Sequence, residues 1–214
     1  MVKLSIAVAF VALLAGFAKA QANDDPAYLA DITKRANDAI KVLAIDDTAK
    51  ADRLRDILIN QYRTLRDWHD ANDAKLKDKS TPPEETNHIA ASLKSVHDKF
   101  LTKLAAELTP EQVEKVKDKM TYNVAHLTYT AYCDELPQLT DAQKAYILAQ
   151  LKEAREIAMD QGSSKEKHAV FGKYKGRINN YLATEGYDLK KAEKEWAERR
   201  KAGATSQAIE QEAK

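Results

Sequence analysis

The stretch LTDAQKAYILAQLKEAREIAMD, residues 139–160, has the pattern of a complete amphipathic helix with its own start signal. Thr140 can accept a hydrogen bond from the backbone N–H of Gln143, and the Gln143 side chain can bond back to the backbone of Thr140 as a capping box. The apolar side chains that follow recur three or four residues apart, as on one face of a helix. The sequence therefore predicts a helix from Asp141 to about Asp160 whose buried face holds Tyr146, Ile147, Leu151, Ala154 and Ile157.

The same start signal recurs in LTPEQ, residues 108–112, where Thr109 and Gln112 form a second capping box and Pro110 takes the first helical position. Apolar spacing is helical almost everywhere else, and no run alternates strictly enough to predict a strand. We therefore expect an all-α fold, a compact antiparallel bundle of six or seven helices on short connections. The remaining helices are expected over 25–43, 46–77, 89–104, 164–186 and 188–201, with Leu29 and Leu76 among the buried residues.

The first twenty residues have the pattern of an export signal. A basic start, MVK, precedes the apolar run LSIAVAFVALLAGFA, and the small-x-small triplets Ala18-Lys19-Ala20 and Ala20-Gln21-Ala22 offer two cleavage points. The run is shorter than the roughly 20 residues that a spanning helix needs, and polar residues follow it directly. We expect a signal peptide over 1–20, one helical domain over 21–202 and a flexible polar tail over 203–214. The mature protein should be periplasmic or secreted, without stable membrane insertion.

Charge and cysteine content narrow the possible partners. Without residues 1–20 the chain has 32 basic and 33 acidic side chains, whereas strong attraction to nucleic acid requires a basic surplus. We therefore expect no nucleic-acid partner. Cys133 is the single cysteine, which excludes an intramolecular disulfide, and we expect it to be a small buried apolar group. The sequence leaves the oligomeric state open.

Two stripes would run along a helix over residues 120–133. One is apolar and suits the core, with Met120, Val124, Leu127 and Ala131. The other consists of Tyr122, His126, Tyr129 and Cys133, and its rings could line a groove because they combine flat apolar faces with polar tips. Such a surface suits a sugar, whose C–H faces stack on aromatic rings. The alternative is that these tyrosines are core residues with bonded hydroxyls.

The stretch HAVFGKYKGRINNYL, residues 168–182, is the second candidate for a binding surface. Lys173, Arg177 and Asn180 follow one another at helical spacing and could hold carboxylates or sugar hydroxyls, with Lys175 and Asn179 in a neighbouring row. Two glycines within four residues destabilise a helix unless something approaches closely. The alternative is a solvated helix face. The predicted ligand-binding residues are Tyr122, His126, Tyr129, Lys173, Tyr174, Arg177, Asn180 and Tyr181.

Signals for catalysis or metal binding are weak. His69 and Asp73 lie four apart on one helix, but a single pair of this kind is common by chance. No zinc-protease motif, nucleophile elbow or phosphate loop is present, so we expect no metal and no cofactor. Glycoside hydrolysis needs two carboxylates that meet only in the fold, so an enzyme stays open as the less favoured alternative. The candidate acids are Asp67, Asp70, Asp134 and Glu135.

Two resemblances bear on function. The pentads LTPEQ and LTDAQ resemble the signature of periplasmic chaperones of the LTxxQ type, which implies an exported, all-helical protein without enzymatic activity. Four longer blocks resemble an uncharacterised family of exported bacterial proteins, often encoded beside polysaccharide-degrading enzymes. These blocks are INQYRTLRDWHD (59–70), LTPEQVEKVKDKMTYNVAHLTYTAY (108–132), LTDAQKAYILAQLKEAREIAMD (139–160) and KHAVFGKYKGRINNYLATEGYDL (167–189).

The second resemblance implies glycan use outside the cytoplasm and no inherited site residue. We therefore expect a non-catalytic glycan-associated protein that binds an oligo- or polysaccharide. A chaperone-like cradle and a small carbohydrate-active hydrolase or lyase are the alternatives. The binding hypothesis requires that the tyrosine stripe and the 168–182 helix face a common cleft.

Overall fold

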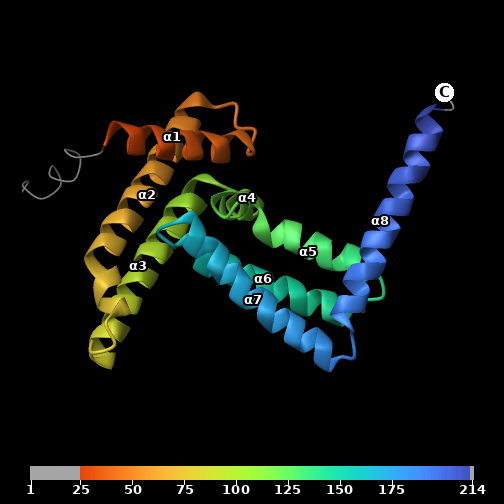
Figure 1. Ribbon diagram of the computed structural model, residues 1–214. Helices are drawn as coiled ribbons and strands as arrows, with labels where there is room; N and C mark the ends of the chain where they lie inside the picture. The colour runs from red at the N-terminus through yellow and green to blue at the C-terminus, as the bar shows by residue number, and fades with distance from the viewer. Residues whose placement is uncertain (1–24, 213–214) are drawn as a thin grey trace, which may run out of the picture.

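The computed structural model describes residues 25–212, with side chains described to residue 202. This part of the chain forms eight α-helices and contains no strand, which confirms the all-α class. Figure 1 shows two long helical hairpins, α2–α3 and α6–α7, joined by shorter helices. The helices are α1 (Pro26–Lys41), α2 (Thr48–Lys77), α3 (Pro83–Glu107), α4 (Pro110–Met120), α5 (Val124–Glu135), α6 (Asp141–Met159), α7 (Ser164–Thr184) and α8 (Leu189–Glu212).

Local signals place most helix starts where the sequence predicts them. Both capping boxes form, with Thr109 accepting from the backbone N–H of Gln112 and Thr140 from that of Gln143. Ser163 caps α7. Three other helices also begin at local signals. Pro26 lies in the first turn of α1, and Asp47 caps α2. At the start of α8, Asp188 accepts a hydrogen bond from the backbone N–H of Lys191.

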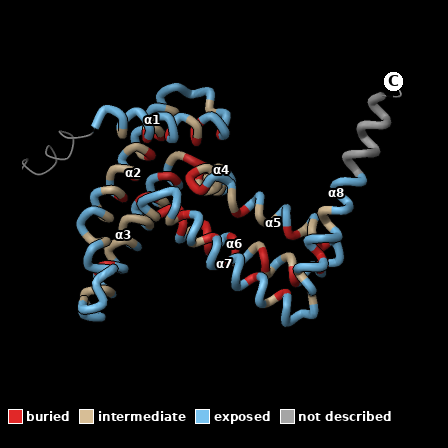
Figure 2. Tube along the Cα trace, viewed as in Figure 1, coloured by how far each residue is buried: buried red, intermediate tan, exposed pale blue. Residues whose placement is uncertain are grey.

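The buried side chains form two separate cores (Figure 2). Helices α1 to α4 surround the first core, which includes Leu54, Leu58, Phe100 and Leu104. Helices α5 to α8 surround the second, which includes Tyr132, Leu136, Leu151, Phe171, Ile178 and Leu182. Burying these large apolar side chains supplies most of the driving force for each half to fold.

Helix α6 belongs to both halves. Ile147, Leu151 and Ala158 lie in the second core, whereas Met159, at the C-terminal end of the same helix, lies in the first. The α2–α3 and α6–α7 hairpins diverge from the region of α4, which contacts both α3 and α6 (Figure 1). The predicted antiparallel packing is therefore organised as two halves that share one helix.

Polar contacts reinforce the junction between the halves. The buried guanidinium of Arg155, in α6, donates to Asp118 at 2.6 Å and to Glu114, both in α4. Asp160, just after α6, accepts a hydrogen bond from His97 of α3 at 2.7 Å, and its carbonyl oxygen lies 2.8 Å from Nε2 of His69 in α2. These contacts hold the end of α6 against three helices of the first half.

An interruption separates the helix expected to start at Pro110 from most of the stretch considered as a helix over 120–133. Tyr122 and Asn123 adopt left-handed backbone conformations, with φ of 58° and 57°, so α4 ends at Met120 and α5 begins at Val124. Asparagine tolerates this conformation, and the backbone N–H of Asn123 satisfies the carbonyl of Asp118 at 2.8 Å. The interruption explains why eight helices form within the described residues instead of six or seven.

Several expectations about individual segments need correction. Leu29, Leu76, Leu127 and Ile157 are exposed large hydrophobic residues and not core residues. Helix α8 continues to Glu212, beyond the expected end near Lys201. The expected signal peptide, residues 1–20, lies outside the described residues. Within 25–212, none of the helices combines the length and the apolar character needed to cross a membrane.

Candidate functional site

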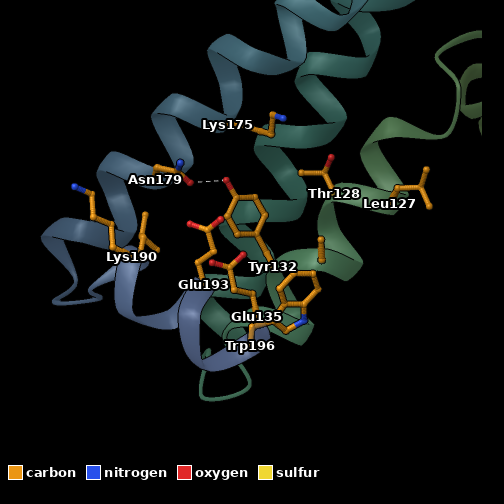
Figure 3. Close-up of a pocket in the computed structure, with 11 residues that line it drawn as sticks. Leu127, Thr128, Tyr132, Glu135, Lys175, Asn179, Lys190, Glu193 and Trp196 are labelled. Atoms are coloured by element: carbon orange, nitrogen blue, oxygen red, sulfur yellow. Dashed lines mark hydrogen bonds between the residues drawn. The ribbon is translucent and has the colours of Figure 1, made fainter. Parts of the chain in front are cut away.

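A groove of about 500 Å³ lies between α5, α7 and α8, and we call it the α5–α8 groove (Figure 3). Tyr132 lies at its centre, and the carboxylates of Glu135 and Glu193 lie beside the Tyr132 ring. It therefore combines aromatic, amide, carboxylate and ammonium groups in one open site. The lining residues are Leu127, Thr128, Ala131, Tyr132 and Glu135 of α5, Lys175 and Asn179 of α7, and Leu189, Lys190, Glu193 and Trp196 of α8.

Helical periodicity explains why these residues share one surface. Thr128, Ala131, Tyr132 and Glu135 follow one another at intervals that place them on one face of α5. Lys175 and Asn179 are four apart on α7 and border its buried face, which holds Phe171, Tyr174, Ile178 and Leu182. The groove thus forms where the edges of two packed helices meet α8.

The centre of the groove is held by a hydrogen bond between two helices. The hydroxyl of Tyr132 donates to Oδ1 of Asn179 at 2.6 Å. Burial, together with the nearby charge of Glu135, raises the pKa of Tyr132 to about 12, so the hydroxyl stays protonated and remains a donor at neutral pH. Within the described residues no acceptor is found for Nδ2 of Asn179, which leaves this group available to a ligand.

Helix α8 is anchored across the end of α5. The indole Nε1 of Trp196 donates to Asp134 at 2.6 Å, and Arg199 donates to the backbone carbonyls of Asp134 and Glu135 at 3.0 and 3.1 Å. The last carbonyls of a helix have no partner within the helix, so Arg199 satisfies two of them. These bonds fix the orientation of the Trp196 ring, which is half-buried.

The carboxylate of Glu193 affects the protonation of Glu135. Burial and the negative charge of Glu193 raise the pKa of Glu135. Lys175 and Lys190 supply positive charge elsewhere in the lining. A ligand in this groove would meet hydrogen-bond acceptors and donors as well as aromatic surface.

The predicted residues of the tyrosine stripe lie outside the groove. Tyr122 is not helical, is 41% exposed and stacks on His168 with ring centroids 5.5 Å apart. His126 is exposed, and Tyr129 is half-buried against the second core. The stripe assigned to the core is also divided, because Leu127 is 62% exposed. The interruption before α5 separates Tyr122 from the other two side chains.

The predicted residues of α7 lie outside the groove, and Tyr174 belongs to the buried face of the helix. Tyr174 is buried, its hydroxyl donates to Glu153 at 2.7 Å, and Arg177 lies over its ring at 4.5 Å. Tyr181 is half-buried against Tyr146, with centroids 4.0 Å apart. Lys173 and Asn180 are exposed on the side of α7 opposite its buried face.

The two helices that carry the predicted residues, α5 and α7, thus both line the groove. The residues that line it belong to other rows on these helices than the predicted ones. The row of Lys175 and Asn179 was visible in the sequence, and Glu135 was among the candidate acids. Tyr132 and Trp196 were missed, because their exposure to a ligand depends on how α8 crosses α5. A ligand-binding role for the eight predicted residues stays a prediction.

The candidate metal pair does form a local contact. Nδ1 of His69 lies 2.8 Å from Asp73, but Nε2 is occupied by the carbonyl of Asp160. Among the residues that the structure describes, no three His, Cys, Asp or Glu side chains are placed to hold a metal ion together.

Comparison with known proteins identifies the family. Residues 29–202 match the family described as "Protein of unknown function (DUF3826)". The chain belongs to the DUF3826 family. The match covers every helix from α2 to α7, so both cores of the structure are features of a DUF3826 domain. It also covers all residues that line the α5–α8 groove. No curated protein matches the chain.

Proposed function

We propose that this protein binds an oligosaccharide segment in the α5–α8 groove without cleaving it. The observation that carries the proposal is the half-buried ring of Trp196 in one open groove with amide and carboxylate groups and with Tyr132, which is 8% exposed. Sugar rings present C–H faces that stack on aromatic surfaces, and their hydroxyls exchange hydrogen bonds with such polar groups. A glycan also agrees with the context that the family resemblance implies.

Preorganisation supports this role. Trp196 is held by Asp134, and Tyr132 by Asn179, so neither ring needs to be ordered when a ligand arrives. Side chains that are already fixed lose less conformational entropy on binding. Nδ2 of Asn179 and the carboxylates of Glu135 and Glu193 then remain to bond sugar hydroxyls.

Calorimetry and a glycan array test the proposal with two pairs of variants. Trp196→Ala should weaken binding of any glycan found for the wild type at least about tenfold, because it removes a stacking surface. Asn179→Ala should weaken it about threefold to tenfold, the usual effect of losing one neutral hydrogen bond. Tyr129→Ala and Lys173→Ala are the controls, because both residues lie outside the groove.

The controls also separate two outcomes. Unchanged binding by Tyr129→Ala and Lys173→Ala would assign the glycan to the α5–α8 groove. A loss of binding in these controls with normal binding by Trp196→Ala would instead favour the residues predicted from the sequence. No binding to any glycan on the array would count against the function itself.

The paired carboxylates favour hydrolysis of a glycosidic bond as a second candidate function. Glycosidases use one protonated and one ionised carboxyl group, and the raised pKa of Glu135 beside Glu193 is an arrangement of this kind. Release of reducing ends from a polysaccharide panel by the wild type, and its loss in Glu135→Gln, would replace the binding proposal with a catalytic one.

We also propose that the chain is exported and loses residues 1–20 or 1–22. The support is the basic start, the apolar run and the small-x-small triplets in the sequence. Expression of the full-length chain in a bacterium, followed by fractionation and N-terminal sequencing, should give a periplasmic or secreted product that begins at Gln21 or Asn23. A cytoplasmic product that retains Met1 would contradict export.

A further inference from the structure

A second cavity, of about 530 Å³, lies in the other half of the molecule between α1, α2 and the first turns of α7. We call it the Lys167 cavity. Its volume is within the range of small-molecule sites, about 300–1,000 Å³. Its wall is rich in ionisable groups. Those that matter here are Arg35 of α1, Tyr62, His69 and Asp73 of α2, and Lys167 of α7.

Lys167 is the unusual member of this wall. Only 4% of the residue is exposed, and its Nζ donates to the backbone carbonyl of Met120 at 3.0 Å. Burial, reinforced by the positive charge of Arg35, lowers the pKa of Lys167 to about 8, although the charge of Asp160 acts in the opposite direction. An ammonium group in such a place is costly unless an anion lies close to it.

Three nearby acids have other partners, and two more carboxylates, those of Asp70 and Glu166, line the same cavity. Asp31 forms an ion pair with Arg35 at 2.8 Å, Asp73 bonds to His69, and Asp160 bonds to His97. Among the described residues, no carboxylate lies within ion-pair distance of Lys167. The ammonium group therefore has two donor positions that the described residues do not use, since a lysine carries three.

The wall around Lys167 is fixed in place. His69 is bonded at both ring nitrogens, and Gly162 approaches its ring so closely that an added Cβ would lie 3.1 Å from it. Burial raises the pKa of Tyr62 to about 12, so this side chain stays neutral and adds no negative charge to the cavity at neutral pH. In this rigid wall Lys167 is a cation that none of the described carboxylates pairs with, so it is suited to meet an oxyanion group of a ligand.

We propose that the Lys167 cavity binds a small molecule through an oxyanion group, a carboxylate or a phosphate, with Lys167 as the cation that meets it. Arg35, which is paired with Asp31 at the same wall, adds planar donors. The proposal rests on the polar cavity alone and does not depend on an oligosaccharide in the α5–α8 groove.

Calorimetry at about pH 7 with three probes distinguishes the possible sources of the oxyanion. Glucuronate offers a carboxylate, inorganic phosphate offers a phosphate, and glucose is the neutral counterpart of glucuronate. We expect at least one anion to bind more tightly than glucose, and the tighter of the two identifies the group that the cavity prefers. Equal or absent binding of all three would overturn the proposal.

Variants then locate the bound anion. Lys167→Met should weaken binding at least about tenfold, because it removes the cation and keeps a long apolar side chain. Lys173→Met is the matched control, since Lys173 is exposed on the same helix and lies outside the cavity. Arg35→Gln, at an exposed position, provides a second test if Lys167→Met does not fold. Wild-type affinity in Lys167→Met, or in Arg35→Gln if the former is unfolded, would overturn the proposal.

The pH dependence adds a signature that a purely structural lysine would not give. If glucuronate binds, its affinity should fall about tenfold between about pH 7 and pH 9, because the lysine loses its proton while the carboxylate charge is constant. Lys167→Met should lack this fall, and its persistence there would assign it to another group. The other charged or titratable groups that face the cavity or Lys167 are Tyr28, Asp31, Arg35, Tyr62, Arg66, His69, Asp70, Asp73, Asp160 and Glu166.

Discussion

The effect of a glycine on stability depends on the atoms that surround it. A Cβ added at Gly172 or Gly176 would meet nothing within 4 Å outside the helix, whereas one at Gly162 would meet the His69 ring at 3.1 Å. Close packing against another described helix therefore does not account for the two α7 glycines. These two positions have no steric need for glycine.

Alanine substitutions should distinguish the unhindered glycines, Gly172 and Gly176, from Gly162, which lies against His69. Gly172→Ala and Gly176→Ala should each raise the free energy of unfolding by about 0.5–1 kcal/mol, because alanine loses less backbone entropy in a helix. Gly162→Ala should lower it by about 1 kcal/mol or more, because the methyl group displaces His69. Urea denaturation measures all three. A destabilised Gly176→Ala protein would show that something does contact α7 there.

His97 is expected to make stability depend on pH. Its hydrogen bond with Asp160 raises the pKa of His97 above 6.5, against the effect of burial. The folded protein therefore binds this proton more tightly than the unfolded chain does. The resulting stabilisation is complete below pH 6.5 and is lost as the pH rises through the raised pKa.

Replacement of His97 should remove this dependence. The stability advantage of the wild type over His97→Gln should shrink by about 1 kcal/mol between about pH 5.5 and pH 8, measured by urea denaturation at each pH. His88→Gln is the control because His88 is exposed on the same helix. A constant difference between wild type and His97→Gln would show that the Asp160 contact does not depend on this proton.

At the scale of elements, two capping boxes of the same design differ in what surrounds them. Gln112 accepts from the backbone N–H of Thr109 at 3.1 Å. Gln143 accepts from Thr140 at 3.0 Å, but it also accepts from the Tyr187 hydroxyl at 2.8 Å and donates to Glu185 at 3.1 Å. The second box therefore ties the start of α6 to the connection between α7 and α8.

This difference predicts unequal costs for the same substitution. Gln112→Ala should lower the free energy of unfolding by about 0.5–1 kcal/mol, as expected for part of a helix cap. Gln143→Ala should lower it by about 2–3 kcal/mol, because it also removes the hydrogen bonds to Glu185 and Tyr187. Thermal or urea unfolding measures both. Equal losses would mean that the contacts to Glu185 and Tyr187 contribute little.

Helix starts could be predicted from the sequence because a cap is local. Thr109, Thr140, Ser163 and Asp188 each act within three residues, so their patterns are complete in the sequence. The interruption at Tyr122 and Asn123 could not be predicted in the same way. Neither glycine nor proline marks it, and an aromatic residue in a left-handed conformation is uncommon.

The candidate site was predictable only in part for a related reason. Periodicity indicates which residues share a face, and α5 and α7, which carry the predicted residues, both line the groove through other residues. It does not indicate which helix packs against that face. Trp196 and Tyr132 become lining residues only because α8 crosses the end of α5 through Asp134 and Arg199.

On the scale of the whole molecule, α6 should couple the two halves during unfolding. It contributes Leu151 to the second core and Met159 to the first, and Arg155 bonds to α4 between them. A helix forms cooperatively, so loss of one core removes packing that the other half needs. The all-α class was predictable from periodicity, but this division into two cores required knowledge of which helices meet.

The two tryptophans report on the halves separately. Trp68 lies in α2 and Trp196 in α8, so Trp68→Phe and Trp196→Phe each leave one fluorescent probe. We expect both variants to give a single transition, in which fluorescence and far-UV circular dichroism have the same midpoint. Leu58→Ala, a change in the first core, should lower the midpoint seen by Trp196 by the same amount as that seen by Trp68. Midpoints that shift separately would contradict the coupling.

The interruption at Tyr122 and Asn123 has an evolutionary consequence. Because α5 begins after the interruption, the rotation of α5 about its own axis, which orients the groove wall, is not fixed by the rotation of α4. Changes that retilt or reshape α4 can therefore accumulate in one lineage while the groove keeps its geometry. In related proteins, the sequences of the two halves should vary at different rates. Asn or Gly should be retained at position 123, because this residue permits the break between α4 and α5.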